Sequence, residues 1–313
     1  MKKKRNGLLE LYRLLFCFWV MYYHEFFFFE NPGDEKIFSI ARLAVDFFFI
    51  LSGFFLLSSM RKLKEEKVFA GAGKLMWSRL KPMSFSLLIA TAFNAVCMAL
   101  FIREDIPGVL LTNFRYWWYL LYMVLAIGIL YLVFRWIKNE KGYAVFLAVL
   151  ALVMGGLHYA MENHGFFIYE FTFVARTFGC LALGMLLSYI PKWKPKKFNY
   201  NILFVVVLVP LTVYLAYIKK DYWLSLTMLG VFMALIYFTA NVNIGGKFCD
   251  VVGQLSVRMY VYMAFVSMLH VLGWAHDRLL FILDGCLATM DVMLSHYYRK
   301  FKELQKKILA SKA

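Results

Sequence analysis

The chain has 313 residues, of which 62% are hydrophobic and only 17% are charged, and its formal net charge is +16 at pH 7. A soluble domain of this length would leave much of that apolar surface in water, so the composition excludes an ordinary soluble protein. Aromatic residues make up 19% of the chain, which is typical of a protein whose tyrosines and tryptophans lie at membrane interfaces. The composition therefore predicts an integral membrane protein.

Long apolar runs follow one another from the first residues to the last. A helix needs roughly 20 apolar residues to cross a bilayer, and these runs are too long and continuous to be barrel strands. We expect about ten spans, the first of them retained because no small-residue cleavage site follows it. Their approximate ranges are 8–29, 38–59, 82–102, 116–134, 143–160, 171–190, 200–218, 222–240, 252–275 and 279–296. The predicted fold is an all-α membrane protein, a bundle of about ten transmembrane helices that forms a single domain over residues 1–313.

Lysine and arginine are distributed unevenly between the predicted loops. If the N-terminus is inside, the inner segments contain 25 of these residues and the outer segments contain 6. Because cytoplasmic loops are enriched in basic residues, this distribution predicts that both termini are cytoplasmic. Residues 297–313 then form a basic cytoplasmic tail, expected to lie along the inner leaflet as a short amphipathic helix. Anionic lipid head groups account for the net charge without nucleic acid as a partner.

Four arginines remain inside predicted spans, and the first of them shares its span with a histidine. Arg13 and His24 are eleven residues apart, so a rotation of about 100° per residue places both on one helix face. Ionisable side chains inside a membrane are costly and usually face the bundle interior or an aqueous cavity. The pattern therefore suggests a polar passage. The alternative is that Arg13 extends to the inner interface and His24 bonds a backbone carbonyl. The other three arginines are Arg42, Arg176 and Arg258.

The second predicted span, ARLAVDFFFILSGFFLLS, contains a further pair of charges. Arg42 and Asp46 are spaced i,i+4, so they are expected to pair on one face and so lower the cost of burying both. Ser52 and Gly53 follow in the middle of the span, where small residues allow helices to approach closely. A packing role is at least as consistent with this dipeptide as a catalytic one, since no GxSxG-type turn surrounds Ser52.

Metal and disulfide chemistry have little support in the sequence. The five cysteines are scattered without a CxxC pair, and the six histidines form no HExxH pattern. We expect no metal site.

The segment AVDFFFILSGFFL resembles the second-span signature of the acyltransferase 3 family of multi-pass membrane acyltransferases. An arginine followed after ten residues by a histidine, here Arg13 and His24, resembles the first-span hallmark of the same family. Weaker similarities occur in RYWWYLL, RTFGCLALGMLLS and GQLSVRMYVYM. The sequence departs from the family pattern at Met263, where the late element often has a histidine, and at Met76, where a loop motif usually has its first arginine.

The resemblance implies acyl transfer, usually of acetyl, from a cytoplasmic acyl-CoA to a hydroxyl of a cell-surface glycan or lipid-linked sugar. Acyl-CoA is then a donor substrate rather than a permanently bound cofactor, and a bacterial plasma membrane is the expected location. His24 is the expected general base, since a neutral imidazole can take the proton of an attacking hydroxyl. Glu30 or Asp46 is a candidate for orienting its ring.

Binding of the donor is assigned to basic residues on the inner side. Arg13 can contact the CoA phosphates, because a guanidinium binds phosphate as a fork. Arg79 and Lys81, in the inner loop before the third span, are second candidates. Direct transfer is the simpler hypothesis, and an acyl-enzyme on Ser52 is the alternative.

Two other classes of protein remain compatible with ten spans and intramembrane charge. One is a transporter or flippase for a glycan precursor, although no pair of similar Gly/Pro-broken spans marks two repeated halves. The other is a non-catalytic membrane component of polysaccharide assembly. The sugar, the acyl chain and the oligomeric state are left open.

Overall fold

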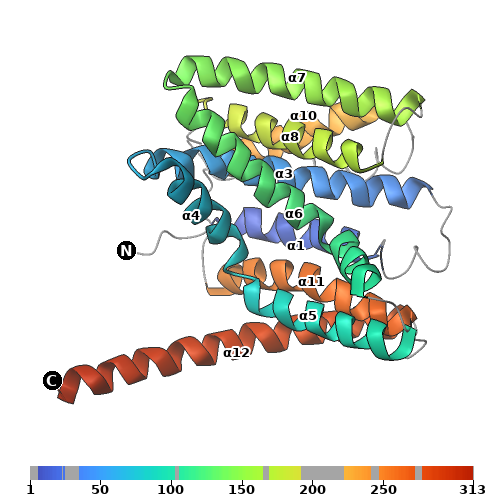
Figure 1. Ribbon diagram of the computed structural model, residues 1–313, viewed down its shortest axis with the longest axis vertical. Helices are drawn as coiled ribbons and strands as arrows, with labels where there is room; N and C mark the ends of the chain where they lie inside the picture. Colours follow the sequence, from blue (N-terminus) through green and yellow to red (C-terminus); the bar gives the residue numbers. More distant parts are fainter. Residues whose placement is uncertain are drawn as a thin grey trace. The chain divides into compact units, whose positions relative to one another are not determined.

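A computed structural model of the protein describes residues 6–22, 24, 35–102, 106–164, 169–191, 222–240, 247–271 and 277–312. Within these ranges the regular structure is entirely helical, with ten α-helices and one short π-helix (Figure 1). The prediction of an all-α protein is confirmed. The helices are α1 (Gly7–Tyr22), α3 (Glu35–Lys62), α4 (Val68–Leu80), α5 (Ser84–Cys97), η2 (Met98–Ile102), α6 (Ile106–Trp136), α7 (Glu140–His164), α8 (Tyr169–Leu187), α10 (Tyr222–Thr239), α11 (Lys247–Val271) and α12 (Asp277–Lys312).

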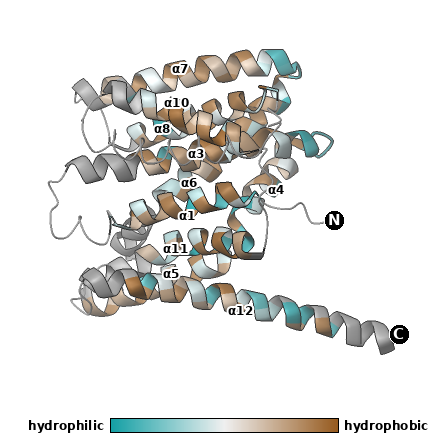
Figure 2. Cartoon of the chain, turned by 180° about the vertical axis from the view of Figure 1, so that it is seen from behind, coloured by the Kyte–Doolittle hydropathy of each residue, from teal (hydrophilic) through white to brown (hydrophobic). Residues whose placement is uncertain are grey.

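The apolar helices identify an integral membrane protein. Four of the described helices are long and apolar enough to cross a membrane, with the segments Leu43–Lys62, Ser84–Phe101, Trp117–Trp136 and Glu140–His158. Two shorter apolar helices cover Phe171–Leu187 and Thr227–Thr239. Hydrophobic residues cover much of α7 and α3 (Figure 2). Every predicted span overlaps a helix except 200–218, which lies outside the described residues.

Two helical features differ from the expectation. Helix α4 occupies part of the segment that we expected to be a cytoplasmic loop, and it buries Gly71, Ala72 and Leu75. Its 13 residues are too few to cross a bilayer, so a search for spans misses it. Helix α12 has 36 residues and continues from the last predicted span through the basic tail. No glycine or proline interrupts residues 287–312, so nothing in the sequence ends the helix at the membrane surface.

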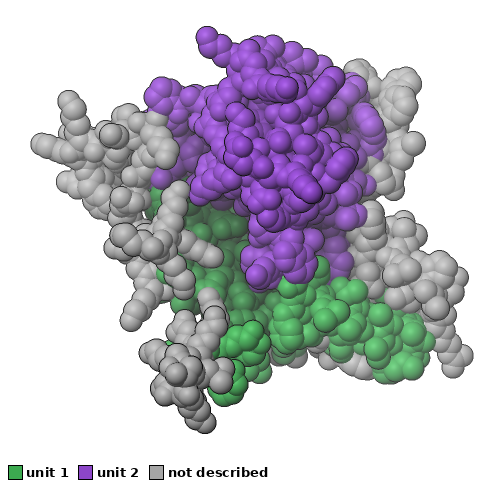
Figure 3. Space-filling model, turned by 60° about the vertical axis from the view of Figure 1, so that its left-hand side comes forward, with its two compact units in different colours: residues 1–32, 83–110, 245–313 green, residues 33–82, 111–244 purple. Residues whose placement is uncertain are grey.

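The chain divides into two compact units, which Figure 3 shows in different colours. Unit 1 comprises residues 1–32, 83–110 and 245–313, and unit 2 comprises residues 33–82 and 111–244. In unit 1, helix α11 packs against α1, α12 and α5. In unit 2, helix α8 packs against α3 and α7, and α10 contacts α3 and α8. The assignment of the chain to a single domain stays a prediction.

Helices α3 and α8 of unit 2 approach each other through glycine. A methyl group at Gly53 would collide with the backbone carbonyl of Leu181, and one at Gly184 would collide with the carbonyl of Ile50. Such close backbone contact is the means by which membrane helices gain van der Waals energy where lipid removes the hydrophobic driving force. The packing interpretation of Gly53 is therefore supported by its contacts.

Aromatic side chains connect α6 to the same two helices. The rings of Tyr119 and Phe49 lie 4.6 Å apart between α6 and α3, and those of Trp118 and Phe173 lie 4.1 Å apart between α6 and α8. The WWY segment of α6 therefore supplies packing area within unit 2. At the other end of α6, the hydroxyl of Tyr131 donates to the carbonyl of Leu63, at 2.7 Å, and so holds the turn after α3.

Candidate functional site

A buried ion pair connects α3 and α8 within unit 2. The guanidinium Nε of Arg176 lies 2.5 Å from Oδ1 of Asp46, and the two side chains are 4% and 10% exposed. The same carboxylate oxygen accepts from the thiol of Cys180, at 3.5 Å. The sequence had suggested Arg42 as the partner of Asp46, but the side chain of Arg42 lies outside the described residues. That pairing stays a prediction, and Arg176 is the partner that the structure shows.

A second ion pair lies among α5, α11 and α12 in unit 1. Nε of Arg258 lies 3.1 Å from Oδ1 of Asp291, and these side chains are 9% and 5% exposed. Asp291 also accepts from the hydroxyls of Tyr262, Ser295 and Ser86. Each of the three helices contributes at least one of these groups, so the hydrogen bonds of Asp291 connect α5, α11 and α12 within unit 1.

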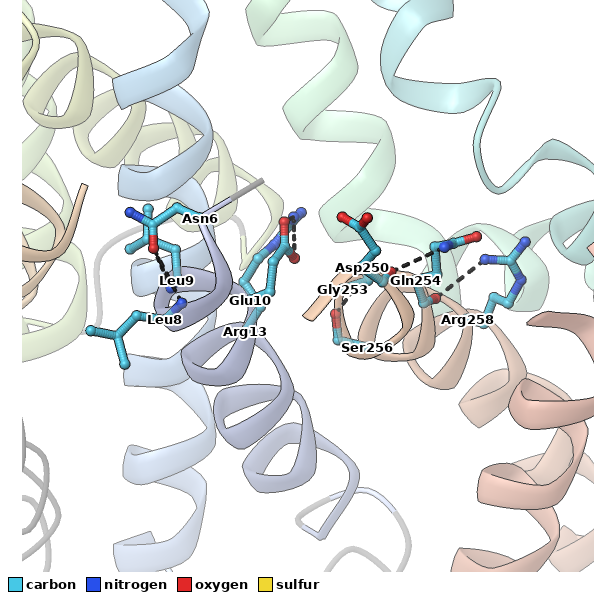
Figure 4. A network of polar contacts seen from close by, with 10 residues as sticks. All are labelled: Asn6, Leu8, Leu9, Glu10, Arg13, Asp250, Gly253, Gln254, Ser256 and Arg258. Carbon is cyan, nitrogen blue, oxygen red and sulfur yellow. Dashed lines mark hydrogen bonds and ion pairs between the residues drawn. The ribbon is translucent and has the colours of Figure 1, made fainter. Parts of the chain in front are cut away.

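The third ion pair lies on α1 itself. Asn6 precedes the helix, and its side-chain oxygen accepts from the backbone N–H groups of Leu8 and Leu9, so it serves as the N-cap (Figure 4). One turn later, Nη1 of Arg13 donates to Oε2 of Glu10 at 3.1 Å and to Oε1 at 3.4 Å. The side chain of Arg13 is 32% exposed and that of Glu10 is 10% exposed.

Helix α1 is held against α11 at two points. The thiol of Cys17 donates to the carbonyl of Ser256, at 3.1 Å. Nearer the start of α1, the carboxylate of Glu10 rests against Gly253, where a methyl group would collide with Oε2. Figure 4 shows the side chains of Glu10 and Arg13 on the side of α1 that faces α11. The position of Arg13 is therefore set by a carboxylate that is itself packed on a neighbouring helix.

The other predicted site residues are distributed over both units. His24 follows α1 in unit 1, where it is half-buried and has a π-helical conformation. Ser52 in α3 and Arg79 in α4 are half-buried, Lys81 after α4 is exposed, and all three belong to unit 2. Glu30 lies outside the described residues. That Arg13 and His24 share one face stays a prediction, as do the supporting roles of Asp46, Ser52 and Glu30.

Two acidic residues of these ion pairs were missed in the sequence. Glu10 lies three residues before Arg13, so the i,i+3 rule for helices could have identified it. Asp291 carries no such local signal, because its arginine belongs to a different helix. Arg176 was recognised as an intramembrane arginine, but its partner is 130 residues away in the chain. Among the described residues, no group of three or more His, Cys, Asp or Glu side chains is placed to hold a metal ion.

These features define a multi-pass helical membrane protein that buries ion pairs within and between its helices. The acyltransferase 3 family, whose domain is described as an acyltransferase domain, matches residues 6–295. The chain belongs to this family and is a membrane acyltransferase, as the first two spans had indicated. The curated proteins and the solved structures contain no significant match to the chain.

Proposed function

We propose that the protein is an O-acyltransferase of a bacterial plasma membrane. It moves an acyl group, expected to be acetyl, from cytoplasmic acyl-CoA to a hydroxyl of a cell-surface or lipid-linked polysaccharide. The observation that carries this proposal is the family match over residues 6–295, which includes all of α1 with Arg13 and the following His24. The positions of these two residues agree with the first-span pattern that the sequence shares with the family.

The reaction needs a base near the acceptor. A sugar hydroxyl is a poor nucleophile at neutral pH, and His24 takes its proton as the oxygen attacks the thioester carbonyl, for roughly 10²–10⁴-fold in rate. The new ester C–O bond forms, the C–S bond of the thioester breaks, and the proton passes from the imidazole to the departing sulfur. The products are the ester and CoA with its thiol restored. His24 is half-buried, which supports a site that limits access of water.

The donor needs a cationic contact on the inner side. Arg13 lies eleven residues before His24, near the start of α1, and its guanidinium is partly exposed. A guanidinium with exposed N–H groups is suited to a phosphate of CoA. Arg79 and Lys81 are second candidates for this contact. The acceptor then approaches from the outer side, with both termini of the chain in the cytoplasm.

Substitution of the proposed base tests the function. We expect His24→Ala and His24→Gln to lower acetyl transfer by about 10²-fold or more at normal membrane expression, because the hydroxyl then loses its proton acceptor. Transfer is measured as acetyl ester on the surface polysaccharide by mass spectrometry. His296→Ala is the matched control, since His296 is an exposed histidine of α12 and lies just beyond the family match.

An unchanged ester content in the His24→Ala strain would show that the catalytic assignment is wrong. A transporter would behave differently, because its variants would reduce export of the glycan while the exported glycan kept its normal ester content.

A further inference from the structure

Glu10 is a buried carboxylate in a membrane helix that neither the sequence pattern nor the family resemblance had singled out. Its side chain contacts Arg13 on its own helix and Gly253 on α11, both within unit 1. Burial of an acidic side chain in such a helix is unfavourable unless a partner compensates its charge. The guanidinium of Arg13 provides that compensation, so the two groups are retained as a unit.

The contact with α11 depends on the absence of a side chain at residue 253. An added Cβ would overlap sterically with the Glu10 carboxylate, so any residue other than glycine would displace the end of that side chain. Figure 4 shows Gly253 on the part of α11 that lies towards Glu10. The Glu10 carboxylate thus occupies the space that a side chain at residue 253 would fill.

The hydrogen bonds leave most of the guanidinium available. Both oxygens of Glu10 accept from the same nitrogen of Arg13, Nη1. Among the residues that the structure describes, none accepts a hydrogen bond from Nε or Nη2 of Arg13. The carboxylate therefore engages only Nη1 of the guanidinium, and the N–H groups of Nε and Nη2 can meet a ligand.

We propose that Glu10 is a positioning residue, which fixes the orientation of Arg13 so that its remaining N–H groups meet a phosphate of the acyl-CoA donor. Gly253 makes this possible by admitting the carboxylate. The inference rests on the proposed function. A carboxylate beside Arg13 weakens the attraction for phosphate, so its benefit is orientation: without Glu10 a long, flexible side chain must be ordered at each binding event.

The test compares two donors in membranes that contain the full-length protein. Acetyl-CoA carries the nucleotide phosphates, whereas acetyl-pantetheine carries none. The ratio of kcat/KM for acetyl-CoA to kcat/KM for acetyl-pantetheine reports contacts to the phosphorylated nucleotide part of CoA, because a variant that merely folds poorly loses activity with both donors equally. We expect this ratio to fall about tenfold in Arg13→Ala, Glu10→Ala and Gly253→Ala, as for loss of one charge-assisted hydrogen bond.

Combined variants make the test more specific. Gly253→Ala should lower the ratio no further once Glu10→Ala is present, since the displaced group is gone. Gly285→Ala is the matched control, because Gly285 is a helical glycine of unit 1 with no atoms near its missing side chain. Its donor ratio should equal that of the wild type.

The possible failures are distinguishable. A ratio that falls in Arg13→Ala but stays at the wild-type value in Glu10→Ala and Gly253→Ala would overturn the positioning role alone. A ratio unchanged in Arg13→Ala would overturn the phosphate contact and the positioning role with it. A wild-type protein that transfers acetyl from neither donor would overturn the proposed function itself.

Discussion

At the scale of single residues, three arginines of the predicted spans are paired with carboxylates: Arg13, Arg176 and Arg258. Arg176 pairs with Asp46 and Arg258 pairs with Asp291, each with both side chains almost fully buried. Arg13 pairs with Glu10 but remains about one-third exposed. The difference is chemical: a guanidinium enclosed by protein serves the fold, while one that retains exposed N–H groups can also bind a ligand.

The interhelical pair makes a prediction for stability. Asp46→Ala leaves the charge of Arg176 buried without its carboxylate, and we expect it to lower the free energy of unfolding by about 3–5 kcal/mol. Replacing both residues, as Asp46→Ala with Arg176→Leu, removes the uncompensated charge and should recover much of the loss. Thermal unfolding in detergent measures both effects.

A surface ion pair of the same unit provides the control. Nη2 of Arg61 lies 2.6 Å from Oε2 of Glu140, and the two side chains are 42% and 49% exposed. Glu140→Ala should cost about 0–1 kcal/mol, because solvent screens exposed pairs. Equal losses in Asp46→Ala and Glu140→Ala would contradict the structural importance of the buried pair.

At the scale of helices, contact between α3 and α8 depends on two glycines that face the partner backbone. Gly184→Ala would push a methyl group against the carbonyl of Ile50, so the helices must separate. We expect a loss of about 1–3 kcal/mol in unfolding free energy, as for other overpacked interfaces. The measurement is the unfolding midpoint of the purified variant.

Gly156→Ala on α7 is the comparison, since no atom lies near its missing side chain. Its midpoint should match that of the wild type. Equal shifts of the unfolding midpoint in Gly184→Ala and Gly156→Ala would show that the close α3–α8 contact is not the cause of the loss.

At the scale of the whole molecule, the basic residues predict how the chain is oriented in the membrane. The predicted inner segments contain 25 Lys and Arg residues against 6 in the outer ones. Cysteine accessibility tests this in a variant without the native cysteines. We expect an impermeant maleimide to label Asn163→Cys in intact cells, and to label Lys138→Cys and Ser311→Cys only after permeabilisation. Labelling of Ser311→Cys in intact cells would place the C-terminus outside and reverse the route of the donor.

The fold was largely predictable where a helix depends on its own residues. Long apolar runs predicted the spans, and they did so for α3 and α7 to within a few residues of the observed ends. Helix α4 was missed because a short helix beside charged loops has no strong hydropathy signal. The basic tail was expected to be a separate amphipathic helix, whereas α12 runs through it without a break from the last span. For the candidate site, the sequence singled out Arg13, His24 and Asp46, whose catalytic and binding roles stay predictions, and it did not identify Glu10 beside Arg13.

The sequence by itself determined that this protein enters a membrane, where its long apolar helices lie along the chain and which family it belongs to. These properties are local: transfer of each segment into lipid depends on that segment's own apolar residues. Only the tertiary structure decided which carboxylate meets which arginine across two helices. Asp46 finds Arg176 across 130 residues because α3 and α8 pack at glycines, and Glu10 rests on α11 because Gly253 leaves room for it. A charge inside a membrane must find its partner on whichever helix lies beside it, and packing decides which helix that is.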